Sequence, residues 1–258
     1  MKKSRLGQNF LYDRYILEKI VRAAGVNGND TVVEIGPGPG ILTRVLSGKA
    51  KRVIAIELDE RLYLNLKAEF AGYRNVELVQ GDVLKFPFEG IGNFKVVANI
   101  PYYITTPIIF RLLEARRGLS TMTLTVQKEV AERIVAPPGG RDYGVLSIMV
   151  QYLAHAELKF MIPREAFRPV PKVDSALLHM RILDKPSVAV RDEETFYRIV
   201  KTSFSQRRKT LSNSLRSFGD EIRDKLVACG IDPRRRPETL SMEEFAKLAD
   251  FLAKGQKS

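Results

Sequence analysis

A glycine-rich turn after a short apolar run is the feature that most restricts the fold of this chain. Thr31–Ile35 is apolar and rich in β-branched residues, and Gly36-Pro37-Gly38-Pro39-Gly40 follows it directly. Glycine lets a backbone turn sharply and come close to a ligand, and open α/β sheets bind cofactors at the carboxyl ends of their strands. The pattern predicts a strand that ends in a cofactor loop. A tight turn without a ligand is the alternative, and three alternating glycines framed by prolines disfavour it.

Short apolar runs continue to alternate with helical patterns along the chain. A helix capped by Asp13 precedes the first run, and two more helices are expected over Asp59–Phe70 and from Thr106-Pro107. This alternation predicts an α/β fold with a Rossmann-like, mostly parallel sheet and helices on both faces. Further strands are expected at Val53–Glu57, Val76–Gln80, Val96–Asn99 and Thr121–Val126, with an antiparallel edge hairpin formed by Ala156–Phe160 and Leu177–Leu183.

The pattern changes beyond Asp184-Lys185-Pro186, where only helical periodicity remains. A domain boundary is therefore predicted near residue 185, between a cofactor-binding catalytic domain over 1–184 and a small helical domain over 185–258. The helices of the second domain are expected at 193–204, 207–218, 220–228 and 242–254.

Charge and composition narrow the classes of function. The formal net charge of +12 indicates a polyanionic partner, with +5 from Lys185 onward and +7 before it. Cys229, His155 and His179 are too few for a Cys/His zinc site or a hydrolase triad, so no metal is expected. No apolar run has the roughly 18 residues of a membrane span, and no apolar signal core follows the basic first residues. A cytoplasmic protein without a membrane partner is expected.

The spacing of the glycines separates the possible cofactors. A dinucleotide fingerprint reads G-x-G-x-x-G, whereas here the spacing is G-x-G-x-G and Ile41 stands where the third glycine would be. No Lys-Ser/Thr pair follows to make a phosphate-binding loop. The pattern E-x-G-x-G-x-G resembles the first motif of class I methyltransferases, in which the loop faces the methionine part of S-adenosylmethionine. That resemblance implies cofactor contacts from Glu34, Gly36, Gly38 and Gly40.

Two acids follow in register on the next strands. Glu57 ends the second strand about 20 residues beyond the first glycine, where a carboxylate can accept both ribose hydroxyl hydrogens. NAD enzymes share this role, so Glu57 alone does not discriminate. Asp82 follows the third strand and is placed to accept from the adenine amine, although alone it would be assigned to a turn. Leu58 and Val83, the residues after these acids, are further expected cofactor contacts, and so is Asn99 at the end of the fourth strand.

The tetrad Asn99-Ile100-Pro101-Tyr102 after the fourth strand specifies the reaction. The 6-amino nitrogen of adenine is a poor nucleophile, because its lone pair is delocalised into the ring. The side-chain oxygen of Asn99 and the backbone carbonyl of Ile100 are two acceptors that would localise that lone pair. Pro101 stiffens the turn, and Tyr102 offers a face for stacking the base. An Asn-Pro turn with a surface tyrosine is the structural alternative.

A second aromatic residue comes from the proline-rich segment Phe167–Ser175. The prolines hold this segment extended, and Phe167 is expected to clamp the target base against Tyr102. A core phenylalanine in a stiff connector fits these residues equally well.

Together these motifs resemble the ribosomal small-subunit RNA adenine dimethyltransferases. The match runs nearly end to end and adds Gly7–Leu11, Phe204–Leu211 and Arg236–Leu240. The resemblance implies that Asn9 and Leu11 also contact the cofactor, and that a monomer dimethylates two adjacent adenosines in a hairpin near the 3′ end of small-subunit rRNA, within a pre-30S particle. Tyr103 departs from the asparagine that bacterial relatives often carry, which is expected to alter the surroundings of Tyr102.

Cations in the helical region are expected to contact RNA phosphates. Arg207, Arg208 and Lys209 are placed at the start of a helix, where a solvated helical face is the alternative. Arg234-Arg235-Arg236 fits a phosphate contact or a structural loop.

Other functions remain open from the sequence. The nearest rival is a relative that dimethylates a large-subunit rRNA adenine and confers macrolide resistance. An RNA-binding ribosome assembly factor is a second, and the intact tetrad disfavours it. A DNA adenine methyltransferase would need a recognition domain for which the chain has no room, and the glycine spacing disfavours a dehydrogenase.

Overall fold

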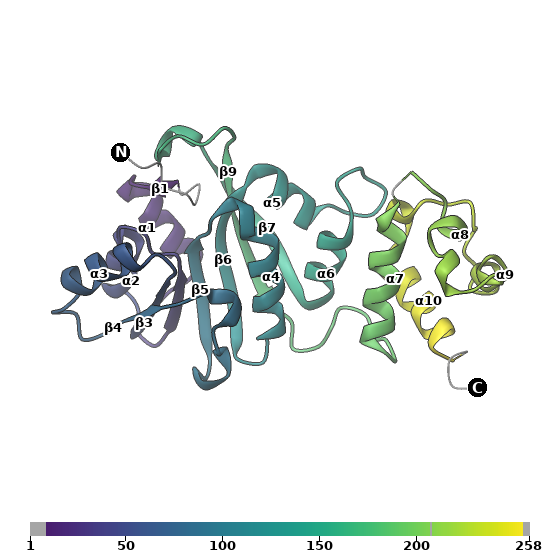
Figure 1. Ribbon diagram of the computed structural model, residues 1–258, viewed down its shortest axis with the longest axis horizontal. Coiled ribbons are helices and arrows are strands. Elements are labelled where there is room, and N and C mark those ends of the chain that lie inside the picture. The colour runs from purple at the N-terminus through teal and green to yellow at the C-terminus, as the bar shows by residue number, and fades with distance from the viewer. Residues whose placement is uncertain (1–8, 207, 255–258) are drawn as a thin grey trace. The chain divides into compact units, whose positions relative to one another are not determined.

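The computed structural model describes residues 9–206 and 208–254 (Figure 1). Their contacts group the chain into two compact units. The first unit holds the residues up to Ala131 together with His155–Ile182, and the second holds Glu132–Ala154 together with the residues from Leu183 onward. The predicted boundary near residue 185 lies close to the last of these divisions, between Ile182 and Leu183, whereas Glu132–Ala154 groups with the C-terminal helices.

The first unit contains a seven-stranded sheet in the order β4-β3-β2-β5-β6-β9-β7. The five strands from β4 to β6 pair in parallel, and β9 pairs antiparallel with β6. This confirms the α/β fold, and the two late strands lie next to each other at the sheet edge. The bounds are β2 (Thr31–Ile35), β3 (Arg52–Glu57), β4 (Val76–Gln80), β5 (Phe94–Asn99), β6 (Leu119–Gln127), β7 (Ala154–Ile162) and β9 (Ser175–Ile182).

Helices connect the parallel strands, and two of the predicted helices begin where expected. The helix expected from Thr106-Pro107 begins at Thr105 instead, so Pro107 is its third residue. Asp13 Oδ1 accepts from the Ile16 N–H at 3.1 Å, and Asp59 Oδ1 accepts from the Leu62 N–H at 3.1 Å, so both acids are N-caps. The helices are α1 (Arg14–Ala23), α2 (Ile41–Ser47), α3 (Glu60–Glu69), α4 (Thr105–Glu114) and α5 (Lys128–Val135), with short 3-10 turns η1 (Val83–Lys85), η2 (Phe88–Gly90), η3 (Tyr102–Ile104) and η4 (Arg164–Ala166).

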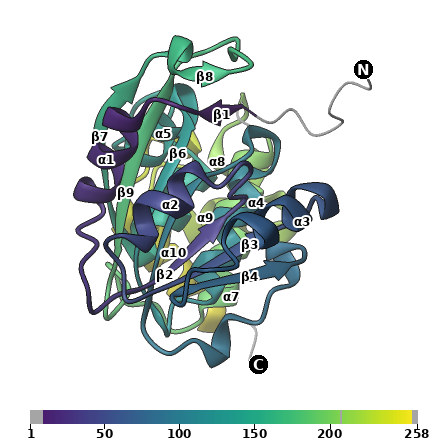
Figure 2. The same cartoon turned by 90° about the vertical axis from the view of Figure 1, so that its left-hand side faces the viewer.

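A two-stranded ribbon lies beside the sheet and was not predicted. β1 (Phe10–Leu11) pairs antiparallel with β8 (Phe167–Arg168), so that Phe10 faces Arg168 and Leu11 faces Phe167 (Figure 2). Each strand has only two residues, and more than 150 residues separate them in the chain. Such short strands carry no periodic pattern that a sequence can reveal.

The second unit is helical. It contains α6 (Val145–Leu153), α7 (Glu193–Ser205), α8 (Leu211–Ser214), α9 (Ile222–Ala228) and α10 (Met242–Lys254), with the 3-10 turns η5 (Arg216–Phe218) and η6 (Pro237–Thr239). Tyr152 on α6 explains why that segment groups with the C-terminal helices. Its ring lies 4.8 Å from the ring of Phe196 on α7, and its hydroxyl donates to Glu193 Oε1 at 3.3 Å.

No helix in residues 9–206 and 208–254 is both long enough and apolar enough to span a bilayer.

A carboxyl group is buried in the core at β2. Glu34 is 1% exposed, and its Oε2 atom has no hydrogen-bond partner among the described residues. Burial raises the pKa of Glu34 from 4.5 to about 8, the neighbouring Thr43 hydroxyl offsets part of the rise, and the charge of Glu57 adds to it. The side chain is therefore a neutral acid at pH 7 in the free protein.

This raised pKa predicts a loss of stability as the pH rises from 4.5 to about 8. Between pH 4.5 and about 8 the folded chain holds a proton on Glu34 that the unfolded chain has released, so the free energy of unfolding falls as the pH rises through this window. Glu34→Gln is neutral at every pH and should flatten that fall in urea unfolding measured from pH 5 to pH 9. An equally steep fall in the variant would show that Glu34 is not the group responsible.

Candidate functional site

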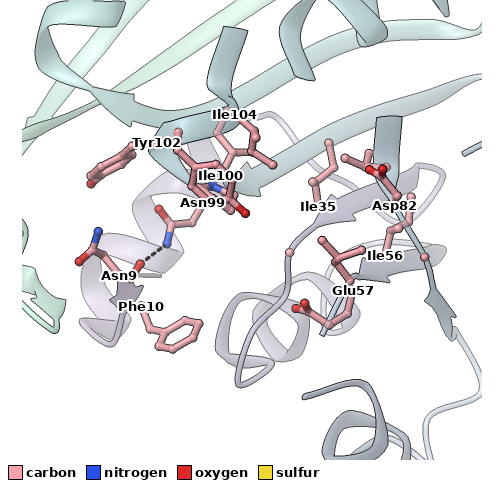
Figure 3. A pocket seen from close by; sticks show the side chains of 16 residues that line it. Asn9, Phe10, Ile35, Ile56, Glu57, Asp82, Asn99, Ile100, Tyr102 and Ile104 are labelled. Carbon is pink, nitrogen blue, oxygen red and sulfur yellow. Dashed lines mark hydrogen bonds between the residues drawn. The ribbon is translucent and has the colours of Figure 1, made fainter. Parts of the chain in front are cut away.

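A pocket lies at the C-terminal ends of the parallel strands (Figure 3). Gly36 follows β2, Glu57 ends β3, Asp82 follows β4 and Asn99 ends β5, and all four line this pocket. Parallel pairing brings these positions together, because every carboxyl end of such a sheet lies on the same side. The structure therefore gathers the residues that the sequence predicted from separate strands.

Glu57 binds the glycine loop as well as facing the pocket. Its Oε2 accepts from the Gly38 N–H at 3.0 Å and its Oε1 accepts from the Asp59 N–H at 2.9 Å. Burial raises the pKa of Glu57, and these backbone donors oppose the rise. A carboxylate has about four acceptor positions, so Glu57 keeps acceptor capacity for a ligand beside its backbone donors. The sequence predicted the ligand role but not the bond to Gly38.

The three glycines of the loop have different surroundings. All have positive φ, at 64° for Gly36, 58° for Gly38 and 79° for Gly40, which L side chains rarely adopt. Gly36 lines the pocket, whereas Gly38 and Gly40 do not. A Cβ atom on Gly40 would lie 2.7 Å from Phe70 Cε2, because α3 packs against the start of α2 there. Gly38 and Gly40 thus shape the loop and its packing.

Asp82 lines the pocket together with Leu58 and Val83. Asp82 Oδ1 accepts from the Leu84 N–H at 3.0 Å and caps η1, so the turn role and the pocket position coexist. Its second oxygen is available for a ligand donor. Leu58, which is 52% exposed, and Val83, which is 6% exposed, also line the pocket as expected.

Asn99 has a fixed orientation. Its Nδ2 atom donates to the backbone carbonyl of Asn9 at 2.9 Å (Figure 3). A carbonyl can only accept, so the amide nitrogen must face Asn9 and the Oδ1 atom must face the other way. Asn9 therefore holds Asn99 as an acceptor, a role for Asn9 that differs from the expected cofactor contact, although Asn9 also lines the pocket.

The rest of the tetrad lines the same pocket. Ile100, Pro101 and Tyr102 all contribute to its wall, although only 1% of the surface of Ile100 is exposed. The Tyr102 and Ser175 hydroxyl oxygens lie 2.5 Å apart, and burial raises the pKa of the Tyr102 hydroxyl. Ser175 was singled out only as the end of the proline-rich segment, and nothing in a sequence shows that β9 brings it to Tyr102.

Tyr103 also faces this pocket and is 56% exposed. Burial raises the pKa of its hydroxyl, and the negative charges of Glu57 and Asp82 add to the rise. The aromatic residue therefore lies on the side of the pocket that the two acids form. The sequence marked Tyr103 only as a departure from the family pattern.

Two predicted site residues lie on the β1–β8 ribbon, and the structure corrects the expectation for Phe167. Phe167 is fully buried and packs in the core with Leu17 and Ile20, so its ring is not exposed to clamp a base. Leu11 is 4% exposed in the same core and its neighbour Phe10 lines the pocket, so the expected cofactor contact of Leu11 stays a prediction. Because side chains alternate along a strand and Leu11 pairs with Phe167, both turn to the same inner face.

The cations of the helical unit lie on turns. Arg207 falls outside the described residues, while Arg208 and Lys209 are exposed and form no ion pair with a described residue. The Lys209 N–H donates to the Gln206 carbonyl at 2.8 Å and α8 begins only at Leu211, so these cations are not at a helix start. Arg235 forms an ion pair with Glu244 and donates to the Thr239 carbonyl at 2.6 Å. Within Arg234-Arg235-Arg236, Arg235 therefore has the role of a structural loop residue.

In the part of the chain that the structure describes, no three His, Cys, Asp or Glu side chains gather where they could hold a metal ion.

Comparison with known proteins places this site in a family. The family model for ribosomal RNA adenine dimethylase matches residues 1–254. The chain is 49% identical to the ribosomal RNA small subunit methyltransferase A of Moorella thermoacetica, over 97% of this chain and 92% of that protein.

Solved structures agree over most of the chain. A dimethyladenosine transferase from Plasmodium falciparum superposes with a TM-score of 0.82 at 30% identity, covering 95% of this chain and 98% of its own. The 23S rRNA methyltransferase ErmE gives a TM-score of 0.73 at 30% identity, covering 95% and 100%. With a pocket that gathers the tetrad, the glycine loop and both acids, and with a family model that spans nearly every residue, the chain belongs to the ribosomal RNA adenine dimethylase family.

Proposed function

We propose that this protein transfers methyl groups from S-adenosylmethionine to the 6-amino groups of two adjacent adenosines in a hairpin near the 3′ end of small-subunit rRNA, during ribosome assembly. The observation that carries the proposal is the fixed Asn99 amide, whose oxygen faces away from Asn9 in the pocket that also holds Glu57 and Asp82. The 49% identity to a small-subunit enzyme supports the choice of subunit over the large-subunit alternative.

The residues of the pocket fit this cofactor. Glu57 and Asp82 keep free acceptor positions for ribose hydroxyls and an adenine amine, and Gly36 has no side chain to fill the space beside Pro101. Leu58 and Val83 supply apolar contact for the adenine ring. When bound, the sulfonium supplies an electrophilic methyl group and departs as a neutral thioether.

The tetrad would prepare the amine for attack. Two acceptors at the amine hydrogens, Asn99 Oδ1 and the Ile100 carbonyl, favour a pyramidal nitrogen with a localised lone pair. Tyr102 stacks on the base and holds it against these acceptors. No strong base is needed before transfer, because the nitrogen attacks as a neutral amine and loses its proton afterwards.

RNA binding is proposed for the helical unit. Arg208 and Lys209 are exposed cations without ion-pair partners in the described part of the chain, so they are available to phosphates. Arg207 is proposed as a third contact on the basis of its sequence position. Such contacts release counterions, which makes the affinity fall steeply with salt.

The direct test uses isotope-labelled S-adenosylmethionine with unmethylated small subunits and, in parallel, large subunits. Label on two adjacent adenines of small-subunit rRNA is expected after the nucleotides are mapped. Label on a large-subunit adenine would establish the rival activity, and an absence of label on either subunit would leave an assembly factor.

Asn99→Ala should lower the turnover number by at least about 100-fold, because the amine loses one of its two acceptors. The variant should bind S-adenosylhomocysteine within several-fold of wild type in calorimetry, since the ribose and adenine contacts remain. Single-turnover methylation of small subunits measures the loss. Turnover equal to wild type would rule out the acceptor role.

Glu57→Ala should weaken S-adenosylhomocysteine binding about 10- to 100-fold, because charge-assisted hydrogen bonds to the ribose are lost and Gly38 is released. Calorimetry gives the dissociation constant. Glu60→Gln, an exposed acid at the start of α3, is the matched control and should bind as wild type does. An unaffected dissociation constant in Glu57→Ala would refute the ribose assignment.

A further inference from the structure

A hydrogen bond joins the tetrad to a distant strand. The Tyr102 and Ser175 hydroxyl oxygens are 2.5 Å apart, although the two residues are 73 positions apart in the chain. Tyr102 begins η3 after β5, and Ser175 is the first residue of β9. β5 pairs with β6, and β6 pairs with β9. These pairings bring the two positions together at the C-terminal ends of β5 and β6.

Ser175 is a rigid partner for this bond. It is fully buried and lies opposite Gln127 in the antiparallel register of β6 and β9. The preceding residue is anchored on both sides, because the Asp174 carbonyl accepts from the Lys128 N–H at 3.1 Å and its Oδ1 accepts from the Arg164 N–H at 3.1 Å. The Ser175 backbone therefore has a fixed position that does not depend on a ligand.

Tyr102 is held at both ends as a result. Its backbone belongs to a turn closed by the Ile104 N–H, which donates to the Pro101 carbonyl at 3.2 Å. Its hydroxyl, at the other end of the ring, is bound to Ser175. A phenol held at both ends cannot swing about its χ1 torsion, so the long axis of its ring keeps one direction in the pocket.

We propose that Ser175 is a positioning residue for methyl transfer, whose hydroxyl holds the Tyr102 ring in the orientation that receives the extruded base. This inference rests on the proposed function. The base platform is then set before RNA binds. It takes over part of the confinement that the fully buried Phe167 does not provide in this structure.

The cost of losing the bond should appear in the chemical step. A tyrosine that swings would let the base adopt more orientations, and a reaction that depends on alignment slows in proportion. The loss expected for one neutral hydrogen bond is about threefold to tenfold in the single-turnover rate. Affinity for the subunit should stay within about twofold, because phosphate contacts dominate RNA binding.

The test is a double-mutant cycle of Ser175→Ala and Tyr102→Phe, which remove the same bond from its two ends. Single-turnover methylation of small subunits is measured with saturating S-adenosylmethionine. Each single variant should lose threefold to tenfold, and the double variant should be no slower than either. Ser175→Thr keeps a hydroxyl and should recover most of the rate.

Ser147→Ala is the matched control for general damage. Ser147 is also fully buried, and its hydroxyl donates to the Arg133 carbonyl at 2.5 Å in the second unit. It should keep the wild-type single-turnover rate. A comparable rate loss in this control would reduce Ser175 to a structural serine.

The remaining outcomes are equally decisive. If the rate loss in the double variant equals the product of the two single losses, the inference is overturned, because the two side chains then act independently. If Ser175→Ala does not fold, a wild-type rate in Tyr102→Phe overturns it alone. Wild-type protein that methylates no adenine would refute the proposed function instead, and that result is read before any variant is compared.

Discussion

Parallel pairing of the first strands is the constraint on which the site depends. The strands run in one direction from β2 to β5, so their carboxyl ends lie side by side at the same end of the sheet. Each of these ends supplies a different group, namely a glycine turn, the carboxylate of Glu57, the carboxylate of Asp82 and the tetrad. Were a single strand reversed, its contribution would lie on the opposite edge. The chemistry of the pocket is therefore a consequence of topology before it is one of side chains.

A second layer of contacts orients the groups that the sheet gathers. The Asn9 carbonyl fixes which end of the Asn99 amide faces the pocket, and Ser175 fixes the ring of Tyr102. Glu57 binds the loop through Gly38. Each of these partners comes from a segment remote from the residue that it orients. A mechanism that relies on alignment of a weak nucleophile needs such support, because misplacement by an ångström is costly.

The sequence predicted those elements that are marked by a local residue pattern. Thr31–Ile35 and Val76–Gln80 were predicted with the bounds that the structure has, because apolar runs and glycine turns are local patterns. The β1–β8 ribbon and the Ser175 contact were not predicted, because each depends on segments distant in the chain. Phe167 shows the limit clearly: an aromatic in a proline-rich segment fits a base clamp and a core residue equally until its strand partner is known.

The bond between Glu57 and Gly38 has a consequence for repeated turnover. Because the chain's own carboxylate holds the loop, the loop does not depend on a ligand for its shape. Two adenosines that each receive two methyl groups require the spent donor to leave and a fresh one to enter several times. A glycine loop that keeps its shape while one cofactor molecule replaces another does not have to refold between methylation steps.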